Sequence, residues 1–152
     1  MNLEKARIID ATGLILGRLA SIVAKRLLQG ETIIIVNAEK AVISGKPKMI
    51  IDSYKLLFEV RTLRNPYKHK IKRPRNPISI VKRTIRGMLP IDKPKGREAF
   101  KRLRVFIGVP PELANREFET LPEAHVSRIA HKYMTVYDLA IQLGWNPKVK
   151  TT

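Results

Sequence analysis

The fold is decided by the stretch Thr32-Ile33-Ile34-Ile35-Val36. Every residue in it is β-branched, a composition that favours an extended strand. The aliphatic side chains follow one another without polar alternation, which is typical of a strand that is buried on both faces in a parallel sheet. We therefore expect a parallel sheet whose two faces are both covered by helices.

The segments around this stretch alternate between strand-like and helix-like patterns. Strands are predicted at 6–10, 41–44 and 105–107, and helices at 17–29, 47–58, 77–86, 97–103 and from Thr135 to Gly144. Local signals mark the helix ends: Gly30 stops the first helix, Asn76-Pro77 starts the third, and Thr135-Val136-Tyr137-Asp138 forms a capping box. This alternation predicts an α/β domain with a mainly parallel sheet.

Helical spacing also predicts which side chains face the core. In the helix at 47–58, the inward set is Ile50, Tyr54, Leu57 and Phe58. In the helix at 77–86, the apolar face carries Ile78, Val81, Ile85 and Met88, and the opposite face carries Lys82, Arg83 and Arg86. The third helix is therefore expected to present a basic surface to solvent.

Positive charge is concentrated in one segment of the chain. The sequence carries 30 Lys and Arg against 13 Asp and Glu, a net charge of +17. Residues 61–104 hold 16 basic and 2 acidic residues, whereas residues 1–60 hold 9 and 6, and residues 105–152 hold 5 and 5. A net +14 over one segment repels itself unless an opposite surface neutralises it, so we expect a polyanion, and nucleic acid above all, as the partner.

The first part of this basic segment is expected to be extended. Asn65 to Pro77 contains three prolines and almost nothing to bury, so it should be poorly ordered until a polyanion neutralises it. Arginine can fork onto phosphates, and Tyr67 and His69 can stack on unpaired bases. A flexible arm beside a basic helix fits a structured RNA with crevices better than a naked duplex, although charge alone does not exclude DNA.

We therefore expect a single domain over residues 1–152, with an RNA-binding segment at 61–104. The candidate RNA-binding residues inside this segment are Arg61, Arg64, Tyr67, Lys68, His69, Lys70, Lys72, Arg73, Arg75, Lys82, Arg83, Arg86, Lys93, Lys95, Arg97, Lys101 and Arg102. Three secondary candidates lie outside it, namely Arg18, Lys46 and Lys48. The last two stand at a predicted helix N-terminus, a position that binds phosphate favourably.

Two glycine motifs resemble nucleotide loops only in part. Gly13-Leu14-Ile15-Leu16-Gly17-Arg18 lacks the spacing of a dinucleotide loop, so a packed strand-to-helix turn is favoured. Ser44-Gly45-Lys46-Pro47 has Lys40 where a phosphate-binding loop needs its first glycine, and Pro47 where that loop needs Ser or Thr. We predict no cofactor and no catalytic residue.

Other residue types narrow the function further. The chain has no cysteine, which excludes disulfides and thiolate metal sites, and none of its three histidines has a partner at metal-ligand spacing. Glutamates at 112, 117, 119 and 123 form either a solvated patch or a contact with a basic neighbour, which is another protein or the chain's own basic segment. Because no apolar run approaches 18 residues and the start lacks a signal-peptide stretch, we expect a cytoplasmic protein without a membrane partner.

Three motifs resemble the universal large-subunit ribosomal protein L-thirteen family. The longest runs from Ile85-Arg86-Gly87-Met88-Leu89-Pro90 through Gly96-Arg97 to Leu103-Arg104-Val105-Phe106-Ile107-Gly108, with five residues in each gap. Gly17-Arg18-Leu19-Ala20-Ser21 and Val36-Asn37-Ala38-Glu39-Lys40 also match. The resemblance covers roughly residues 6 to 145, and the part after Pro110 resembles the archaeal and eukaryotic branch.

The resemblance implies both a fold and a role. The fold would be a three-layer α/β/α domain with a four-stranded, mainly parallel sheet and a basic extension. The role would be that of a structural constituent of the large ribosomal subunit that binds ribosomal RNA and supports subunit assembly, with no catalysis and no cofactor. Neighbouring ribosomal proteins are implied partners, and some members of the family also bind messenger RNA.

Two alternative functions stay open from the sequence. An RNA-modifying or nucleotide-using enzyme would need a polar cluster at the carboxyl ends of the strands, for which Asp10, Asn37 and Ser44 are the only nearby candidates. A translational regulator acting off the ribosome has the same sequence requirements as a ribosomal constituent, so the sequence does not separate the two.

Overall fold

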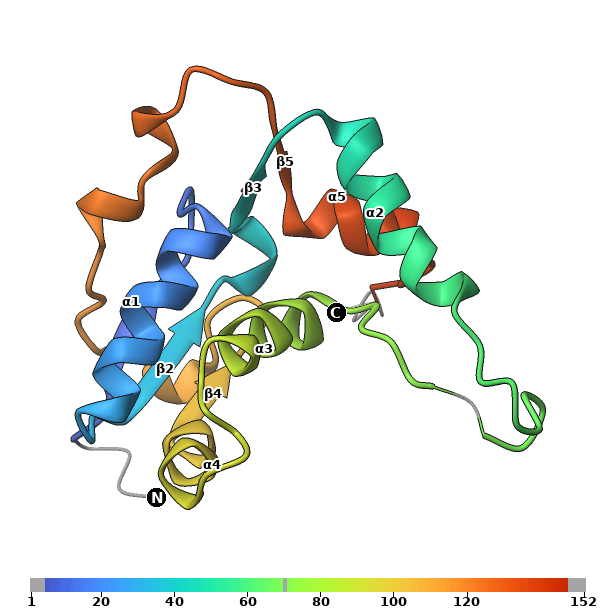
Figure 1. Cartoon of the computed structure of the whole chain (residues 1–152). Coiled ribbons are helices and arrows are strands. Elements are labelled where there is room, and N and C mark those ends of the chain that lie inside the picture. The colour runs from blue at the N-terminus through green and yellow to red at the C-terminus, as the bar shows by residue number, and fades with distance from the viewer. Residues whose placement is uncertain (1–4, 70, 148–152) are drawn as a thin grey trace.

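The structure is a computed structural model that describes residues 5–69 and 71–147 (Figure 1). Along the chain the elements are β1 (Arg7–Asp10), α1 (Leu16–Leu28), β2 (Ile33–Val36), the 3-10 turn η2 (Ala38–Lys40), β3 (Val42–Ser44), α2 (Pro47–Glu59), α3 (Pro77–Gly87), α4 (Pro94–Lys101), β4 (Leu103–Val105), three further 3-10 turns η3 (Pro111–Leu113), η4 (Pro122–Ala124) and η5 (Val126–Arg128), β5 (Tyr133–Thr135) and α5 (Val136–Gln142).

The central element is β2, which pairs in parallel with β1 on one edge and with β4 on the other. Ile33 lies opposite Arg7 and Leu103, and Ile35 lies opposite Ile9 and Val105. All four side chains of β2 are fully buried. The strand predicted from the aliphatic run, and the parallel sheet predicted from it, are confirmed.

The helices that cover this sheet lie on one face, not on two as expected. Ile33 and Ile35 belong to a cluster that also holds the buried faces of α1, α3, α4 and α5. Ile34 and Val36 point to the other face, which irregular chain and η3 cover through Phe106, Leu113 and Phe118. The crossovers from β1 to β2 and from β2 to β4 step across the sheet in the same direction, and crossovers of one hand then place their helices on the same side.

The parallel sheet has three strands where the resemblance implied four. β3 pairs instead with β5 in a separate antiparallel ribbon, in which Val42 lies opposite Thr135. Along the outer edge of β1 the backbone of Glu119 forms a single bridge: its N–H donates to Ile8 (2.7 Å) and its carbonyl accepts from Asp10 (3.1 Å). Pro122, which has no backbone N–H, starts η4 three residues later, so a full strand does not form there.

The helix starts predicted from capping residues are confirmed, whereas some core positions predicted from helical spacing are wrong. The Asn76 side chain accepts a hydrogen bond from the Ser79 N–H (2.7 Å), and Thr135 caps α5 through the Asp138 N–H (3.2 Å), as predicted. Met88 was predicted to face the core, but it lies beyond the last residue of α3 and is 43% exposed. Leu57 was also predicted to face the core, but it is exposed, whereas Ile50 of the same helix is buried.

The fourth helix and fourth strand both lie earlier in the chain than predicted. The helix expected at 97–103 is α4, which begins at Pro94 and ends at Lys101. The strand expected at 105–107 is β4, which begins at Leu103. Proline at the first helical position is favourable, so Pro94 moves the helix start forward and the strand follows it.

Gly96 is a glycine at which another backbone segment leaves no room for a side chain. It is buried in the first turn of α4, and a Cβ atom there would overlap the carbonyl group of Pro90. The Ile91 backbone nitrogen would lie 3.0 Å away as well. Helix α4 therefore packs against the turn after α3 through a backbone contact that a side chain would prevent.

We expect the substitution Gly96→Ala to lower the free energy of unfolding by about 1–3 kcal/mol, because backbone atoms cannot rotate away as a side chain can. Urea unfolding followed by circular dichroism measures this. Gly87→Ala is the matched control: it lies in α3 with no atom within 4 Å of the new Cβ. It should leave stability unchanged or raise it by up to about 1 kcal/mol. Equal effects of the two substitutions would contradict the contact.

Candidate nucleic-acid interface

The basic segment consists of the loop 61–76, then α3, α4 and β4, with a turn over residues 88–93 between the two helices. The loop projects away from the parallel sheet beyond the end of α2 (Figure 1). Its described residues form no helix or strand, as predicted, apart from a turn in which the Asn65 carbonyl accepts from the Lys68 and His69 N–H groups (3.2 and 3.1 Å). Asn65 adopts a left-handed conformation (φ 46°) in that turn.

The positive charge of this segment is not neutralised from within. In the part of the chain that the structure describes, no basic side chain of residues 61–104 pairs with a carboxylate. The ion pairs instead join Arg7 to Glu31 and Glu119, and Arg26 to Glu119, around β1 and α1. The charge between residues 61 and 104 is therefore not balanced by carboxylates of the described residues.

Three candidate arginines bind the ends of helices. Their guanidinium groups donate to carbonyls in the last turns of α1 and α2 and at the C-cap of α5, where helix carbonyls carry partial negative charge. The pairs are Arg102 with Leu27 (2.7 Å), Arg73 with Leu57 (3.1 Å) and Arg75 with Leu143 (2.8 Å). These arginines thus fasten the basic segment to three helices.

Two more arginines hold the basic segment to itself. Arg83 of α3 donates to the Lys72 carbonyl (2.8 Å) and so ties the loop to the helix. Arg97 of α4 donates to the carbonyls of Ile91 (3.1 Å) and Asp92 (2.9 Å), and so ties the preceding turn to the helix. A guanidinium group has five N–H donors, so each arginine keeps donors for a phosphate.

The side chains of the other candidates bind no other residue in the part of the chain that the structure describes. They make no side-chain hydrogen bond or ion pair there, and all are exposed except the half-buried Lys82: Arg18, Lys46, Lys48, Arg61, Arg64, Tyr67, Lys68, His69, Lys72, Lys82, Arg86, Lys93, Lys95 and Lys101. Lys70 was also predicted, and it lies outside the described residues. Almost all lysines of the segment are thus available to a partner.

The structure brings some candidates together and adds one. Lys82 of α3 and Lys101 of α4 border one pocket of about 410 Å³ with Arg104 of β4. Arg104 was not among the predicted RNA-binding residues. Its signal was present in the sequence, because Arg104 stands between Leu103 and Val105 in a strand, and alternation turns it outward while both neighbours are buried.

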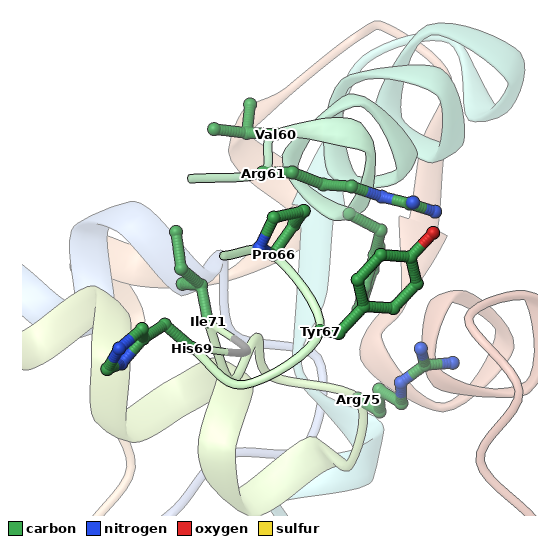
Figure 2. Close-up of a pocket in the computed structure, with 8 residues that line it drawn as sticks. Val60, Arg61, Pro66, Tyr67, His69, Ile71 and Arg75 are labelled. Atoms are coloured by element: carbon green, nitrogen blue, oxygen red, sulfur yellow. The ribbon is translucent and has the colours of Figure 1, made fainter. Parts of the chain in front are cut away.

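A second group gathers at the loop. Arg61, Tyr67, His69 and Arg75 border one pocket of about 390 Å³ at the end of α2 (Figure 2). The secondary candidates Lys46 and Lys48 stand at the other end of α2. Because that helix has 13 residues and rises 1.5 Å per residue, about 20 Å separates its two ends. These two lysines therefore do not belong to the loop cluster.

The polar residues considered for an enzyme site form a structural turn. The Asn37 amide (3.0 Å) and the Thr12 hydroxyl (2.7 Å) and backbone N–H (3.0 Å) all donate to one carboxylate oxygen of Asp10. Burial would raise the pKa of Asp10, but these hydrogen bonds outweigh it and hold the pKa below its usual range. Ser44 lies in the other sheet. The carboxylate is thus used to join the ends of β1 and β2.

The order of the strands differs from that of open sheets that bind nucleotides at a switch point. In open α/β sheets, ligands bind where the strand order reverses, and the order β1-β2-β4 has no such reversal. Among the described residues, no group of three or more His, Asp or Glu side chains is arranged to hold a metal ion. None of the described helices is both long and apolar enough to cross a membrane.

Of the glutamates at 112, 117, 119 and 123, Glu119 contacts a basic neighbour within the chain. Its carboxylate contacts Arg26 (2.7 Å) and Arg7 (3.6 Å), so the basic neighbour belongs to α1 and β1 rather than to the basic segment. The hydrogen bond from Arg26 holds the pKa of Glu119 below its usual value, and the same contact raises the pKa of Arg26. The pair fastens the C-terminal part of the chain to the outer edge of the sheet.

We expect Arg102→Gln to lower the free energy of unfolding by about 1–2 kcal/mol, because the Leu27 carbonyl loses a charged donor. The neighbouring substitution Lys101→Gln is the control, since Lys101 is exposed and holds no described residue, and its effect should stay within about 0.5 kcal/mol. Urea unfolding of both variants gives the comparison. A loss of stability in Lys101→Gln as large as in Arg102→Gln would refute the division between anchoring and free basic residues.

We expect Glu119→Gln to destabilise the protein by about 1–2 kcal/mol at neutral pH, because Arg26 loses its carboxylate partner. A lowered folded-state pKa means that this stability is present above the ordinary value of 4.5 and is lost as the pH falls through the folded-state pKa. Unfolding measured from neutral to acidic pH should therefore show the two proteins converging in acid. Glu117→Gln, at an exposed carboxylate, serves as control, and a pH-independent difference for Glu119→Gln would count against the pair.

Comparison with known proteins matches the sequence of this chain to one family. The family model of ribosomal protein L13 matches residues 4–112. The large ribosomal subunit protein uL13 of Saccharolobus solfataricus is 52% identical over 143 residues, covering 94% of this chain and 95% of the relative. The protein of the same name from Aeropyrum pernix is 47% identical (94% and 92% covered), and that from Methanocaldococcus jannaschii is 48% identical (90% and 96% covered). This chain belongs to the ribosomal protein L13 family, on its archaeal branch.

Proposed function

We propose that this chain is a structural, non-enzymatic constituent of the cytoplasmic large ribosomal subunit. In this role it binds ribosomal RNA through residues 61–104 of a single domain and supports assembly of the subunit. The observation that carries the proposal is the net +14 of this segment, for which the described residues provide no carboxylate partner. Family membership supports it, because the relatives are named as large ribosomal subunit proteins.

The proposed mechanism divides the basic residues by their contacts. The five arginines bound to carbonyls hold the loop, α3 and α4 in place before RNA arrives. The free lysines and arginines then neutralise phosphates and release the counterions condensed on the RNA. A surface whose shape is fixed in advance loses less conformational entropy on binding than a disordered tail does.

The part that adapts is the start of the extension, residues 61–69, which precedes the anchored Arg73 and Arg75. In the described residues it has no sheet or helix of its own, so RNA contacts would complete its order. Neighbouring ribosomal proteins are the second class of partner that we propose. Messenger RNA, a partner of some family members, gains no support from the geometry or from the relatives.

We expect the affinity for large-subunit ribosomal RNA to fall about 10³- to 10⁵-fold between 50 and 200 mM salt, if about 6–10 phosphates are contacted. Filter binding over a salt series measures this. The triple variant Lys82→Gln, Lys101→Gln and Arg104→Gln should reduce the slope of log affinity against log salt by about 3. Lys132→Gln, an exposed lysine outside the segment, is the control. A flat salt response of the wild type would exclude the mechanism.

Sedimentation of a cell extract through a sucrose gradient tests the location. We expect the chain to migrate with the large subunit and to remain there after a wash at moderate salt, because many phosphate contacts hold it at once. Recovery only in the light fractions would contradict the ribosomal role and favour a regulator acting off the ribosome.

A further inference from the structure

The pocket at the loop combines an aromatic wall with a basic rim. It lies between the end of α2 and the loop 61–76 and has a volume of about 390 Å³, within the usual range for small-ligand sites (Figure 2). Phe58, Pro66 and Ile71 contribute apolar surface, and Arg61 and Arg75 border it. No carboxylate side chain lines the pocket. A ligand that fits these walls is apolar in its body and negative at its edge.

Tyr67 supplies a free ring at this pocket. Its side chain is 86% exposed, far more than is usual for an aromatic residue. Figure 2 shows the ring at the opening that the Arg61 and Arg75 side chains border. Among the described residues, no other ring stacks on it. A flat partner would therefore remove this ring from water without displacing any contact of the chain.

Arg75 is held in place before any ligand arrives. One of its terminal nitrogens donates to the Leu143 carbonyl (2.8 Å), and its guanidinium carbon lies 4.4 Å from the centre of the Phe58 ring. Both contacts fix the plane of the group, and its remaining N–H groups have no acceptor among the described residues. A fixed guanidinium group binds an anion with a smaller loss of side-chain entropy.

We propose that this pocket binds one unstacked nucleotide of the RNA, with the base against the Tyr67 ring and the adjoining phosphate between Arg61 and Arg75. The proposal rests on the proposed function, and it names the kind of RNA structure that this part of the interface takes. An apolar peptide would leave two guanidinium groups without partners, and a phosphate alone would leave the ring in water. A duplex does not offer a free base face, whereas a loop or bulge does.

Binding to deproteinised large-subunit ribosomal RNA from the chain's own organism tests the proposal. Tyr67→Ala should weaken binding by about 5- to 150-fold, the range for loss of one stacked base, and should leave the salt slope unchanged. Tyr67→Phe keeps the ring and should bind within about twofold of the wild type. Leu63→Ala changes a fully exposed side chain of the same loop (104% exposed) and should also have no effect. Because Tyr67 and Leu63 are exposed, unfolding curves of the variants should match that of the wild type.

The phosphate contact gives an independent arm of the test. Arg61→Gln should weaken binding and reduce the salt slope by about 1, since it removes one counterion-releasing contact and no stacking surface. The proposal is overturned if Tyr67→Ala binds within twofold of the wild type, if Tyr67→Phe loses as much as Tyr67→Ala, or if Leu63→Ala loses as much. Failure of the wild type itself to bind, or a flat salt response, would instead remove the proposed function.

Discussion

β2 must be covered on both faces and paired along both edges, because its four side chains are aliphatic and none of them reaches water. The edges are satisfied by β1 and β4, which lie far apart in the sequence and meet only at this strand. The two faces are covered differently: helices pack on one face, and the irregular chain around η3 packs on the other. The arrangement of the other elements around β2 follows from this requirement.

The connections between the strands also place the polar and the basic groups of the chain. Asp10 and Asn37, at the carboxyl ends of β1 and β2, bind each other and so join the two strands. The long connection between β2 and β4 has to return to the sheet. It contains the loop 61–76, α3 and α4, which hold most of the basic segment. Most of the positive charge therefore lies in one connection between two neighbouring strands of the parallel sheet.

Arginine and lysine take different parts in this surface. Arginine has a planar group with several donors, so one side chain can satisfy a helix carbonyl and still face solvent. Lysine carries a compact, well-hydrated charge, and the described lysines of the segment hold no other residue. Charge that would otherwise only repel itself is thus used in part to build the interface, since the carbonyl ends of α1, α2 and α5 attract it.

The sequence by itself determined what depends on neighbours along the chain. The aliphatic run, the caps at Asn76 and Thr135 and the segregation of charge all act within a few residues, so they could be read directly. Only the tertiary structure decided which face the helices cover, that β3 pairs with β5, and which arginines are anchored. Arg102 reaches a carbonyl 75 residues away and Arg75 one 68 residues away, and no local pattern encodes such partners. These contacts are decided by tertiary packing, because the burial of β2 restricts where the other elements can pack.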